Sequence, residues 1–311
     1  MIQAEHFTFP SADRKTQIHA MQWKPEGPVT GILQLVHGMQ EFIERYDDFA
    51  RFMSGNGYLV VGHDHLGHGA SVADENSYGY FAEKNGNKVL LADMRSLHRM
   101  MSEKYPEVPY FMLGHSMGSF LARQYICMYG HYLNGAVISG TAWHSGTECR
   151  GGMLLCKGIA RFRGWHYISK LLTFMVVGSL NKKFEPSRTH VDWLTRDEAV
   201  VEAYRHDERT HHFFTLNANY NLFVSLKYLT VRANLERMPK SLPLLFIAGE
   251  MDPVGNFGNG VKKVFVQLQA LGMTDVKCKL YPNDRHEVLN ELDKGQVYKD
   301  VLEWIRQRSR R

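Results

Sequence analysis

Short apolar runs alternate with segments of helical periodicity along most of the chain, and this alternation constrains the fold more than any other feature. The apolar runs have the length of buried strands. They occupy residues 31–36, 58–61, 110–113, 136–138 and 244–248. Amphipathic helical patterns lie between them at residues 45–53, 89–104 and 117–129. Because such helices can cover both faces of a parallel sheet, we predict an α/β fold with a mostly parallel, doubly covered sheet.

The two ends of the chain are expected to complete that sheet. Residues 7–23 alternate weakly in polarity, which predicts an antiparallel hairpin at the edge of the sheet. A final strand is predicted at residues 276–281, and a C-terminal helix is predicted at residues 294–307.

A long insertion interrupts the alternation. About 100 residues separate the fourth predicted strand from the fifth, which is far more than one crossover connection needs. This stretch has helical patterns of its own, and a helix at residues 222–235 is expected to lead back to the sheet. We therefore predict a helical cap at residues 143–229, inserted into a core formed by residues 1–142 and 230–311.

The five residues from Gly114 to Gly118, Gly-His-Ser-Met-Gly, lie between a predicted strand and a predicted helix. Gly-x-Ser-x-Gly alone is a weak match, but this context is the one that a nucleophile elbow requires. The sharp turn strains the serine backbone, and neighbours without a bulky Cβ tolerate that turn. The helix N-terminus also stabilises a developing anion. Ser116 is therefore the candidate nucleophile, and an ordinary glycine-rich turn is the alternative.

A serine hydroxyl needs a base, and the base needs an acid that orients it. In elbow enzymes the order along the chain is serine, acid, histidine. Asp252 and His286 each follow a predicted strand at its C-terminal end, where the sites of α/β sheets form. We predict that His286 takes the Ser116 proton and that Asp252 fixes the histidine tautomer. The competing acids are Glu250, Asp284 and Glu287, and a capping role is the alternative for Asp252.

Acyl transfer also needs hydrogen-bond donors for the oxyanion. The backbone N–H of Met117, directly after the nucleophile, is the first candidate. The loop after the first buried strand begins His37-Gly38-Met39, and the position after His-Gly usually supplies the second donor. We therefore predict an oxyanion hole formed by the main-chain N–H groups of Met39 and Met117.

These motifs occur together in an order that resembles a known family. They are His37-Gly38, Asp64-x-x-Gly67-His68-Gly69-x-Ser71, Gly114-His115-Ser116-Met117-Gly118-Ser119, Asp252-Pro253-Val254 and Arg285-His286-Glu287-x-Leu289-Asn290-Glu291. The set resembles the monoacylglycerol lipase and lysophospholipase-like branch of the α/β-hydrolases, also described as serine aminopeptidase-like hydrolases. The resemblance covers the whole chain, and the last motif looks especially like bacterial members.

The resemblance implies an α/β-hydrolase fold with a helical cap, and ester hydrolysis through an acyl-enzyme without a cofactor. The family's triad matches Ser116, Asp252 and His286, and its oxyanion positions match Met39 and Met117. One loop departs from the family, because Gln40-Glu41-Phe42 stands where Gly-Glu-His is common. That difference concerns the shape of the loop and its contacts with a polar head group rather than the reaction class.

The substrate that the resemblance implies is a small ester, in particular a monoacyl lipid such as monoacylglycerol or a lysophospholipid. Two alternatives remain, an aminopeptidase or amidase on the same scaffold and a catalytically silent binding module with the same fold. Dehalogenases and epoxide hydrolases carry Asp at the nucleophile position, so Ser116 argues against both.

The run from His63 to His68, His-Asp-His-Leu-Gly-His, has the appearance of a metal site. It nearly matches the His-x-His-x-Asp-His run of the metallo-β-lactamase family, whose zinc ions activate water. Gly67 stands where that run requires a carboxylate. We therefore predict no metal, and we expect Asp64 and His68 to hold loops near the active-site rim through hydrogen bonds.

The net charge of +5 is unevenly distributed. The chain has 37 Lys and Arg residues and 32 Asp and Glu residues, and this basic excess is too small to indicate a nucleic-acid-binding protein. Residues 149–184, however, contain seven basic residues, no acidic residue and many large apolar ones. Such a lid suits a lipid substrate and transient contact with an anionic membrane surface. An apolar face packed on the core, with solvated basic residues, is the equally weighted alternative.

The termini and the cysteines predict a cytoplasmic protein. Residues 1–10 lack the basic and apolar regions of a signal peptide, and the longest strongly apolar run spans about half a membrane. The four cysteines are not spaced as in metal-binding or redox-active motifs. They are Cys127, Cys149, Cys156 and Cys278. We expect free thiols, with a disulfide between Cys149 and Cys156 as the alternative. The sequence gives no indication of an oligomeric state.

Overall fold

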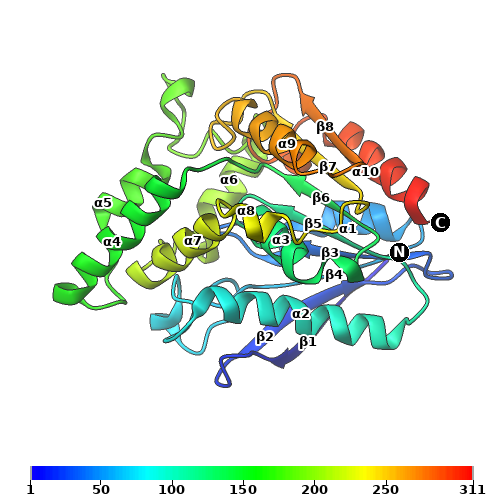
Figure 1. The fold of residues 1–311 in the computed structure, drawn as a ribbon, viewed down its shortest axis with the longest axis horizontal. Coiled ribbons are helices and arrows are strands. Elements are labelled where there is room, and N and C mark those ends of the chain that lie inside the picture. The colour runs from blue at the N-terminus through cyan, green and yellow to red at the C-terminus, as the bar shows by residue number, and fades with distance from the viewer. Residues whose placement is uncertain (1, 310–311) are drawn as a thin grey trace.

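The computed structural model describes residues 2–309 and contains one eight-stranded sheet (Figure 1). Its strand order is β1-β2-β4-β3-β5-β6-β7-β8. β1 and β2 form an antiparallel hairpin at one edge, β2 pairs antiparallel with β4, and the remaining pairs are parallel. The bounds are β1 Ala4–Pro10, β2 Gln17–Trp23, β3 Gly31–Val36, β4 Tyr58–His63, β5 Tyr110–His115, β6 Gly135–Ser139, β7 Leu244–Gly249 and β8 Val276–Tyr281. The predicted α/β fold and its edge hairpin are confirmed.

Helices cover both faces of the sheet (Figure 1). Those outside the long insertion are α1 Asp47–Ser54, α2 Gly86–Lys104, α3 Met117–Tyr129, α9 Asn259–Ala270 and α10 Lys294–Ser309. The side chains of β3 alternate between two apolar cores. Ile32 and Val36 belong to the core shared with α2, α3 and α9, whereas Leu33 and Leu35 belong to the core shared with α1 and α10. Strands buried on both faces require this double cover, which is why they appear as continuous apolar runs.

The chain between β6 and β7 contains the helices expected of an insertion. They are α4 Gly146–Arg163, α5 Lys170–Thr173, α6 Glu198–His206, α7 Leu216–Tyr228 and α8 Arg232–Leu235. α4 and α5 project beyond the end of the sheet at the left of Figure 1, whereas α7 packs on α2 and α3. Buried amides fasten α7 to the core, since the Asn87 N–H donates to Asn221 Oδ1 at 2.8 Å. The cap boundaries at residues 143 and 229 stay a prediction.

Single turns of 3₁₀ or π helix complete the described chain. They are η1 Ile43–Tyr46, η2 Glu75–Ser77, η3 Gly130–Tyr132, η4 Phe174–Gly178, η5 Lys182–Phe184, η6 Glu208–Thr210 and η7 Val288–Asn290. Two of these turns lie beside groups of the site described below. η1 follows the loop at the end of β3, and η7 follows the loop at the end of β8.

The prediction of one helix at residues 222–235 is wrong. α7 begins at Leu216 because the Thr215 side chain accepts a hydrogen bond from the Ala218 N–H and caps the helix. It ends at Tyr228, and in the following turn Thr230 Oγ1 donates to the carbonyl oxygen of Lys227. The apolar periodicity continues across this turn, so it does not reveal the break.

Two findings bear on the membrane and on redox chemistry. Among residues 2–309, no helix is both long enough and apolar enough to cross a membrane. All four cysteines are free thiols, with Cys127, Cys149 and Cys156 buried and Cys278 partly exposed. The alternative of a disulfide between Cys149 and Cys156 is therefore not realised, although both lie on α4.

Candidate active site

Ser116 occupies a sharp turn between β5 and α3. Its φ of 53° and ψ of −122° lie in a region that residues with a side chain rarely adopt, and its backbone N–H donates to the Ser139 carbonyl at 3.0 Å. A Cβ at Gly118 would lie 2.5 Å from the His37 carbonyl oxygen, and one at Gly114 would lie 2.7 Å from the Ala122 Cβ. The glycines therefore permit the close approach of strand and helix that holds Ser116 in the predicted elbow.

His286 and Asp252 meet beyond the ends of β8 and β7. His286 Nδ1 lies 3.0 Å from Asp252 Oδ1, and both side chains are buried. Asp252 Oδ1 also accepts a hydrogen bond from the Val254 N–H at 2.8 Å, which fixes the carboxylate. His286 Nε2 has no hydrogen-bond partner among residues 2–309, so this nitrogen is free to accept a proton. The structure thus brings together the acid and the base that the sequence predicts.

The three competing acids have other partners or face solvent. Glu250 is exposed, Asp284 pairs with Arg196 at 2.5 Å, and Glu287 pairs with Arg45 at 2.8 Å. Among the four candidate acids, Asp252 is the one whose carboxylate contacts the His286 ring. The geometry therefore favours Asp252 over the alternatives.

The electrostatic surroundings of His286 favour its protonated form. Burial opposes protonation, but the carboxylates of Asp252, Glu287 and Glu41 outweigh burial and raise the pKa of His286 above its ordinary value. The neighbouring His115 ring lies 4.6 Å from the His286 ring, and burial holds the pKa of His115 well below its ordinary value. A neutral His115 avoids repulsion when His286 carries a proton.

The loop after β3 lies directly against the nucleophile. A Cβ at Gly38 would lie 2.9 Å from the Ser116 Cβ, so the main chain beside Met39 approaches the serine as an oxyanion donor must. Gln40 has a φ of 56°, the left-handed conformation that glycine adopts most easily. Met117 begins α3, and the first N–H groups of a helix have no partner within the helix.

A buried charge network, which the sequence did not reveal, joins this loop to His286. Arg45 Nη1 and Nη2 donate to the two oxygens of Glu287, each at 2.8 Å, and Arg45 Nη1 lies 3.0 Å from Glu41 Oε2. Glu41 accepts hydrogen bonds from the Gly38 N–H and from Tyr46 Oη. Pairing with Arg45 overcomes burial and lowers the pKa of Glu287 to about 2, whereas burial raises the pKa of Glu41 to about 7. The network therefore connects the loop after β3, which carries Met39, to the loop that carries His286.

Asp64 holds loops together. Its carboxylate accepts hydrogen bonds from the Ile43 N–H at 2.8 Å and the Ala70 N–H at 2.9 Å, and it lies 2.8 Å from His19 Nδ1. A Cβ at Gly69 would overlap this carboxylate. Among residues 2–309, the one group of at least three potential metal-binding side chains does not include Asp64 or the histidines of residues 63–68, and it consists of Asp284, Glu291 and Asp293.

One residue of the insertion, Trp193, lies against His286. The Trp193 ring lies 5.1 Å from the His286 ring, and the His286 N–H donates to the Trp193 carbonyl at 3.4 Å. Trp193 itself packs on a small apolar cluster of the insertion. Sequence reasoning missed it because nothing in the local pattern links it to a histidine more than ninety residues later.

This arrangement can carry out nucleophilic acyl transfer. Ser116 is partly exposed, so a substrate carbonyl can reach it, while the buried His286 and Asp252 can accept and stabilise its proton. The N–H groups beside Ser116 can stabilise the negative charge on the carbonyl oxygen.

Comparisons with known proteins identify the family of the chain. The family model described as serine aminopeptidase, S33, matches residues 27–293. The chain belongs to this family. Among curated relatives, a monoglyceride lipase of Mus musculus is 26% identical over 92% of this chain and 86% of its own length. A monoacylglycerol lipase of Mycolicibacterium smegmatis is 27% identical over 91% of this chain and 90% of its own.

Solved structures are similar to this chain over 99% of its length. A thermostable carboxyl esterase from Bacillus coagulans in complex with glycerol has a TM-score of 0.91 and 27% identity, covering 99% of this chain and all of that one. A monoglyceride lipase variant from Saccharomyces cerevisiae has a TM-score of 0.76 at 20% identity, which shows a shared fold. The predicted α/β-hydrolase fold and the predicted branch of that superfamily are confirmed, and the relatives support an ester hydrolase.

Proposed function

We propose that the protein is a serine carboxylic ester hydrolase that works through an acyl-enzyme. Ser116 attacks the ester carbonyl, His286 takes the serine proton and returns it to the leaving alcohol, and Asp252 holds the imidazole and stabilises its charge. The backbone N–H groups of Met39 and Met117 bind the oxyanion. Water then attacks the acyl-enzyme while His286 takes a proton from it. His286 returns this proton to the Ser116 oxygen, and the carboxylic acid is released. The observation that carries the proposal is the strained Ser116 elbow together with the buried His286–Asp252 pair, since the His286 ring lies 4.6 Å from the ring of His115, the residue before Ser116.

A monoacyl lipid such as a monoacylglycerol is the substrate that we favour. Curated relatives over most of the chain are monoglyceride or monoacylglycerol lipases. The insertion, our proposed cap at residues 143–229, also supplies apolar surface. Each methylene that leaves water contributes about 0.8 kcal/mol, so a long acyl chain can dominate binding without many polar contacts.

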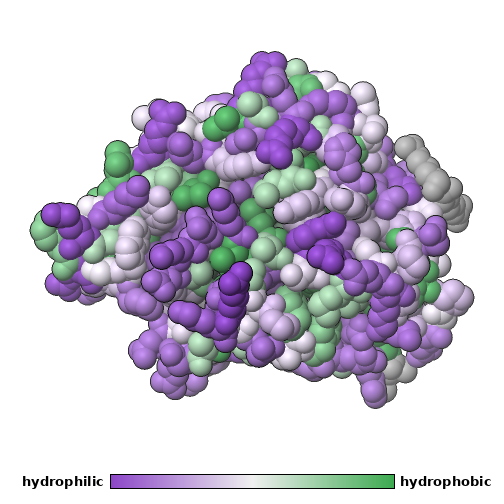
Figure 2. Space-filling model, turned by 60° about the horizontal axis from the view of Figure 1, so that its bottom comes forward, coloured by the Kyte–Doolittle hydropathy of each residue, from purple (hydrophilic) through white to green (hydrophobic). Residues whose placement is uncertain are grey.

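The exposed surface of the cap also suits contact with an anionic membrane. The small buried residues of α4 pack towards α7, but large apolar residues nearby remain exposed, including Leu154 at 69%, Phe162 at 83% and Phe174 at 65%. All seven basic residues between 149 and 184 are exposed as well. Figure 2 shows hydrophobic side chains among hydrophilic ones at the left end, where Figure 1 places α4 and α5. This favours the membrane hypothesis over a fully packed apolar face.

Membrane contact can be tested with co-sedimentation on vesicles that contain an anionic phospholipid. Phe162→Ser combined with Phe174→Ser is expected to reduce the bound fraction, and high salt is expected to reduce it for the wild type. Val266→Ser is the matched control, because Val266 is 59% exposed on α9, outside the cap. Equal binding by the double variant and the control would exclude the cap as the contact surface.

Covalent labelling and substrate profiling test the function itself. A fluorophosphonate probe is expected to label the wild type and to fail with Ser116→Ala. Hydrolysis of p-nitrophenyl esters is expected to increase with acyl-chain length, and monoacylglycerol is expected to be cleaved. A sharp preference for acetate would contradict the lipid substrate, and faster cleavage of aminoacyl anilides would favour the aminopeptidase alternative. Absence of labelling would favour a silent binding module.

We also propose a cytoplasmic location, since the four free thiols suit a reducing compartment.

A further inference from the structure

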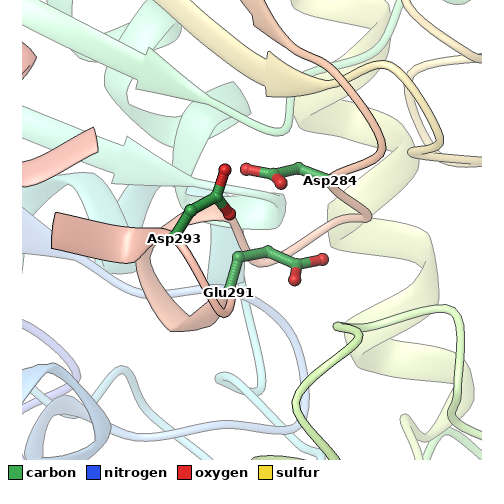
Figure 3. A group of neighbouring side chains, drawn as sticks. All are labelled: Asp284, Glu291 and Asp293. Carbon is green, nitrogen blue, oxygen red and sulfur yellow. The ribbon is translucent and has the colours of Figure 1, made fainter. Parts of the chain in front are cut away.

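Three acidic side chains gather in the loop after β8, beside the catalytic histidine. Asp284, Glu291 and Asp293 place carboxylate oxygens within 4.8 Å of one another, and Asp284 and Glu291 are buried. Figure 3 shows the Asp284 and Asp293 carboxylates facing each other, with Glu291 on the same loop. Buried carboxylates at this spacing repel one another unless a cation lies between them.

Arg196, from the insertion, supplies that cation. Its Nη2 lies 2.5 Å from Asp284 Oδ1 and 2.8 Å from Asp293 Oδ1, and its Nε lies 3.0 Å from Glu291 Oε2. The planar guanidinium matches several carboxylates at once, which the compact ammonium of a lysine does less well. The acidic cluster is therefore a binding site for an arginine of the same chain.

Glu291 connects two backbone segments that are distant in sequence. Its carboxylate accepts hydrogen bonds from the Arg285 N–H at 2.8 Å and from the Arg196 N–H at 3.2 Å. Arg285 directly precedes His286 in the chain. The same carboxylate thus holds the backbone before the catalytic histidine and the backbone of the insertion.

Further hydrogen bonds extend this connection along both segments. The Glu287 N–H donates to the Leu194 carbonyl at 2.7 Å, and Thr195 Oγ1 donates to the Asn290 carbonyl at 3.0 Å. Arg285 donates from Nη1 to the carbonyl of Asp192. Residues 192–196 therefore lie along residues 285–291. This contact places the Trp193 ring 5.1 Å from the His286 ring.

We propose that Arg196 is a positioning residue for the reaction: through Glu291 and Asp284 it fixes the segment 192–196 on the loop that carries His286. The inference rests on the proposed function, since it assigns a role in that reaction. Arg196 touches neither the triad nor the substrate carbonyl, so its effect passes through the placement of His286. Because small misplacements of a catalytic group are costly, loss of the contact lowers turnover.

Kinetics on a short ester separate positioning from lipid binding. With p-nitrophenyl butyrate, whose short acyl chain buries little apolar surface, Arg196→Met is expected to lower kcat by about 10-fold or more while KM changes by less than about 2-fold. Arg196→Lys keeps the charge and is expected to recover part of kcat. Arg188→Met is the matched control, because Arg188 pairs with Glu198 and Glu202, which both belong to the insertion.

A folded Arg196→Met variant with wild-type kcat would overturn the inference, as would a loss that appears in KM alone or equally in Arg188→Met. If Arg196→Met shows no cooperative thermal unfolding, Glu291→Gln is measured instead, with the same expected loss of kcat. A folded Glu291→Gln variant with wild-type kcat overturns the inference too. Failure of the wild type to react with the fluorophosphonate probe would instead defeat the proposed function, which the Arg196 variants do not test.

Discussion

Arg45 forms two parallel hydrogen bonds to Glu287, each 2.8 Å long, across 242 residues of sequence. Glu287 directly follows His286, the proposed catalytic base, in the chain. Glu41 shares the same guanidinium, and the Tyr204 ring of α6 lies 4.9 Å from it. One buried cation therefore contacts the loop after β3, the loop that carries His286 and the insertion.

Arg45→Met is expected to destabilise the protein by about 3–5 kcal/mol, because two buried carboxylates lose their counter-ion. Arg51→Met is the control, since the Arg51–Asp47 pair is much more exposed and is worth less than about 1 kcal/mol. Urea unfolding at neutral pH measures both free energies of unfolding. Similar losses of unfolding free energy in the two variants would show that the buried network stabilises the protein no more than an exposed ion pair does.

Asp252→Asn is expected to lower kcat by about 10³–10⁴-fold, because the amide no longer holds the His286 tautomer that accepts the serine proton. Glu250→Gln should retain wild-type kcat, since Glu250 is exposed and lies two residues from Asp252. Initial rates with p-nitrophenyl butyrate, with thermal unfolding to verify the fold, provide the measurement. A comparable loss in Glu250→Gln would mean that the acid of the triad is misassigned.

Gly118→Ala is expected to destabilise the elbow and to abolish most of the activity, because the added Cβ overlaps the carbonyl oxygens of Val36 and His37. Gly158→Ala is the matched control in the interior of α4, where a Cβ meets nothing within 4 Å. It should stabilise the protein by about 0.5–1 kcal/mol through helix propensity. Thermal unfolding and ester hydrolysis distinguish the two, and a fully active Gly118→Ala variant would refute the tight approach.

Acid is expected to destabilise the protein from about pH 6.5 downward. Burial lowers the pKa of His37 to about 3 and that of His63 and His68 to about 4, against 6.5 in the unfolded chain. Below about pH 6.5 these histidines are protonated in the unfolded state and remain neutral in the folded state. The free energy of unfolding therefore falls as the pH decreases. Each of His63 and His68 contributes a loss on the order of 2–3 kcal/mol by about pH 4.

His63→Phe should remove one such group and reduce the slope of this free energy against pH by up to one proton equivalent between about pH 6 and pH 5. The exposed Val266→Ser is the control, because it removes no titratable group, and it should keep the wild-type slope. Urea unfolding across this pH range gives both slopes. Equal slopes in wild type and His63→Phe would show that His63 takes up no proton on unfolding.

The sheet and the candidate triad were accessible to sequence reasoning because each depends on a local signal. Strand runs, helical periodicity and the elbow motif are short-range patterns, and they predicted β3 to β8 and the turn at Ser116. The two ends of α7 were not accessible, since its start depends on the Thr215 cap and its end is followed by a side-chain hydrogen bond from Thr230. Periodicity reports which residues face the core, not where a helix stops.

The sequence by itself determined the α/β fold, the order of Ser116, Asp252 and His286, and the composition of the insertion. The tertiary structure decided which of four acids contacts His286, and which arginines hold its loop on either side. Arg45 and Arg196 each pair with carboxylates far away in the chain. Such pairs leave no periodic trace in the sequence, because buried charges find their partners only when the strands and the insertion have come together.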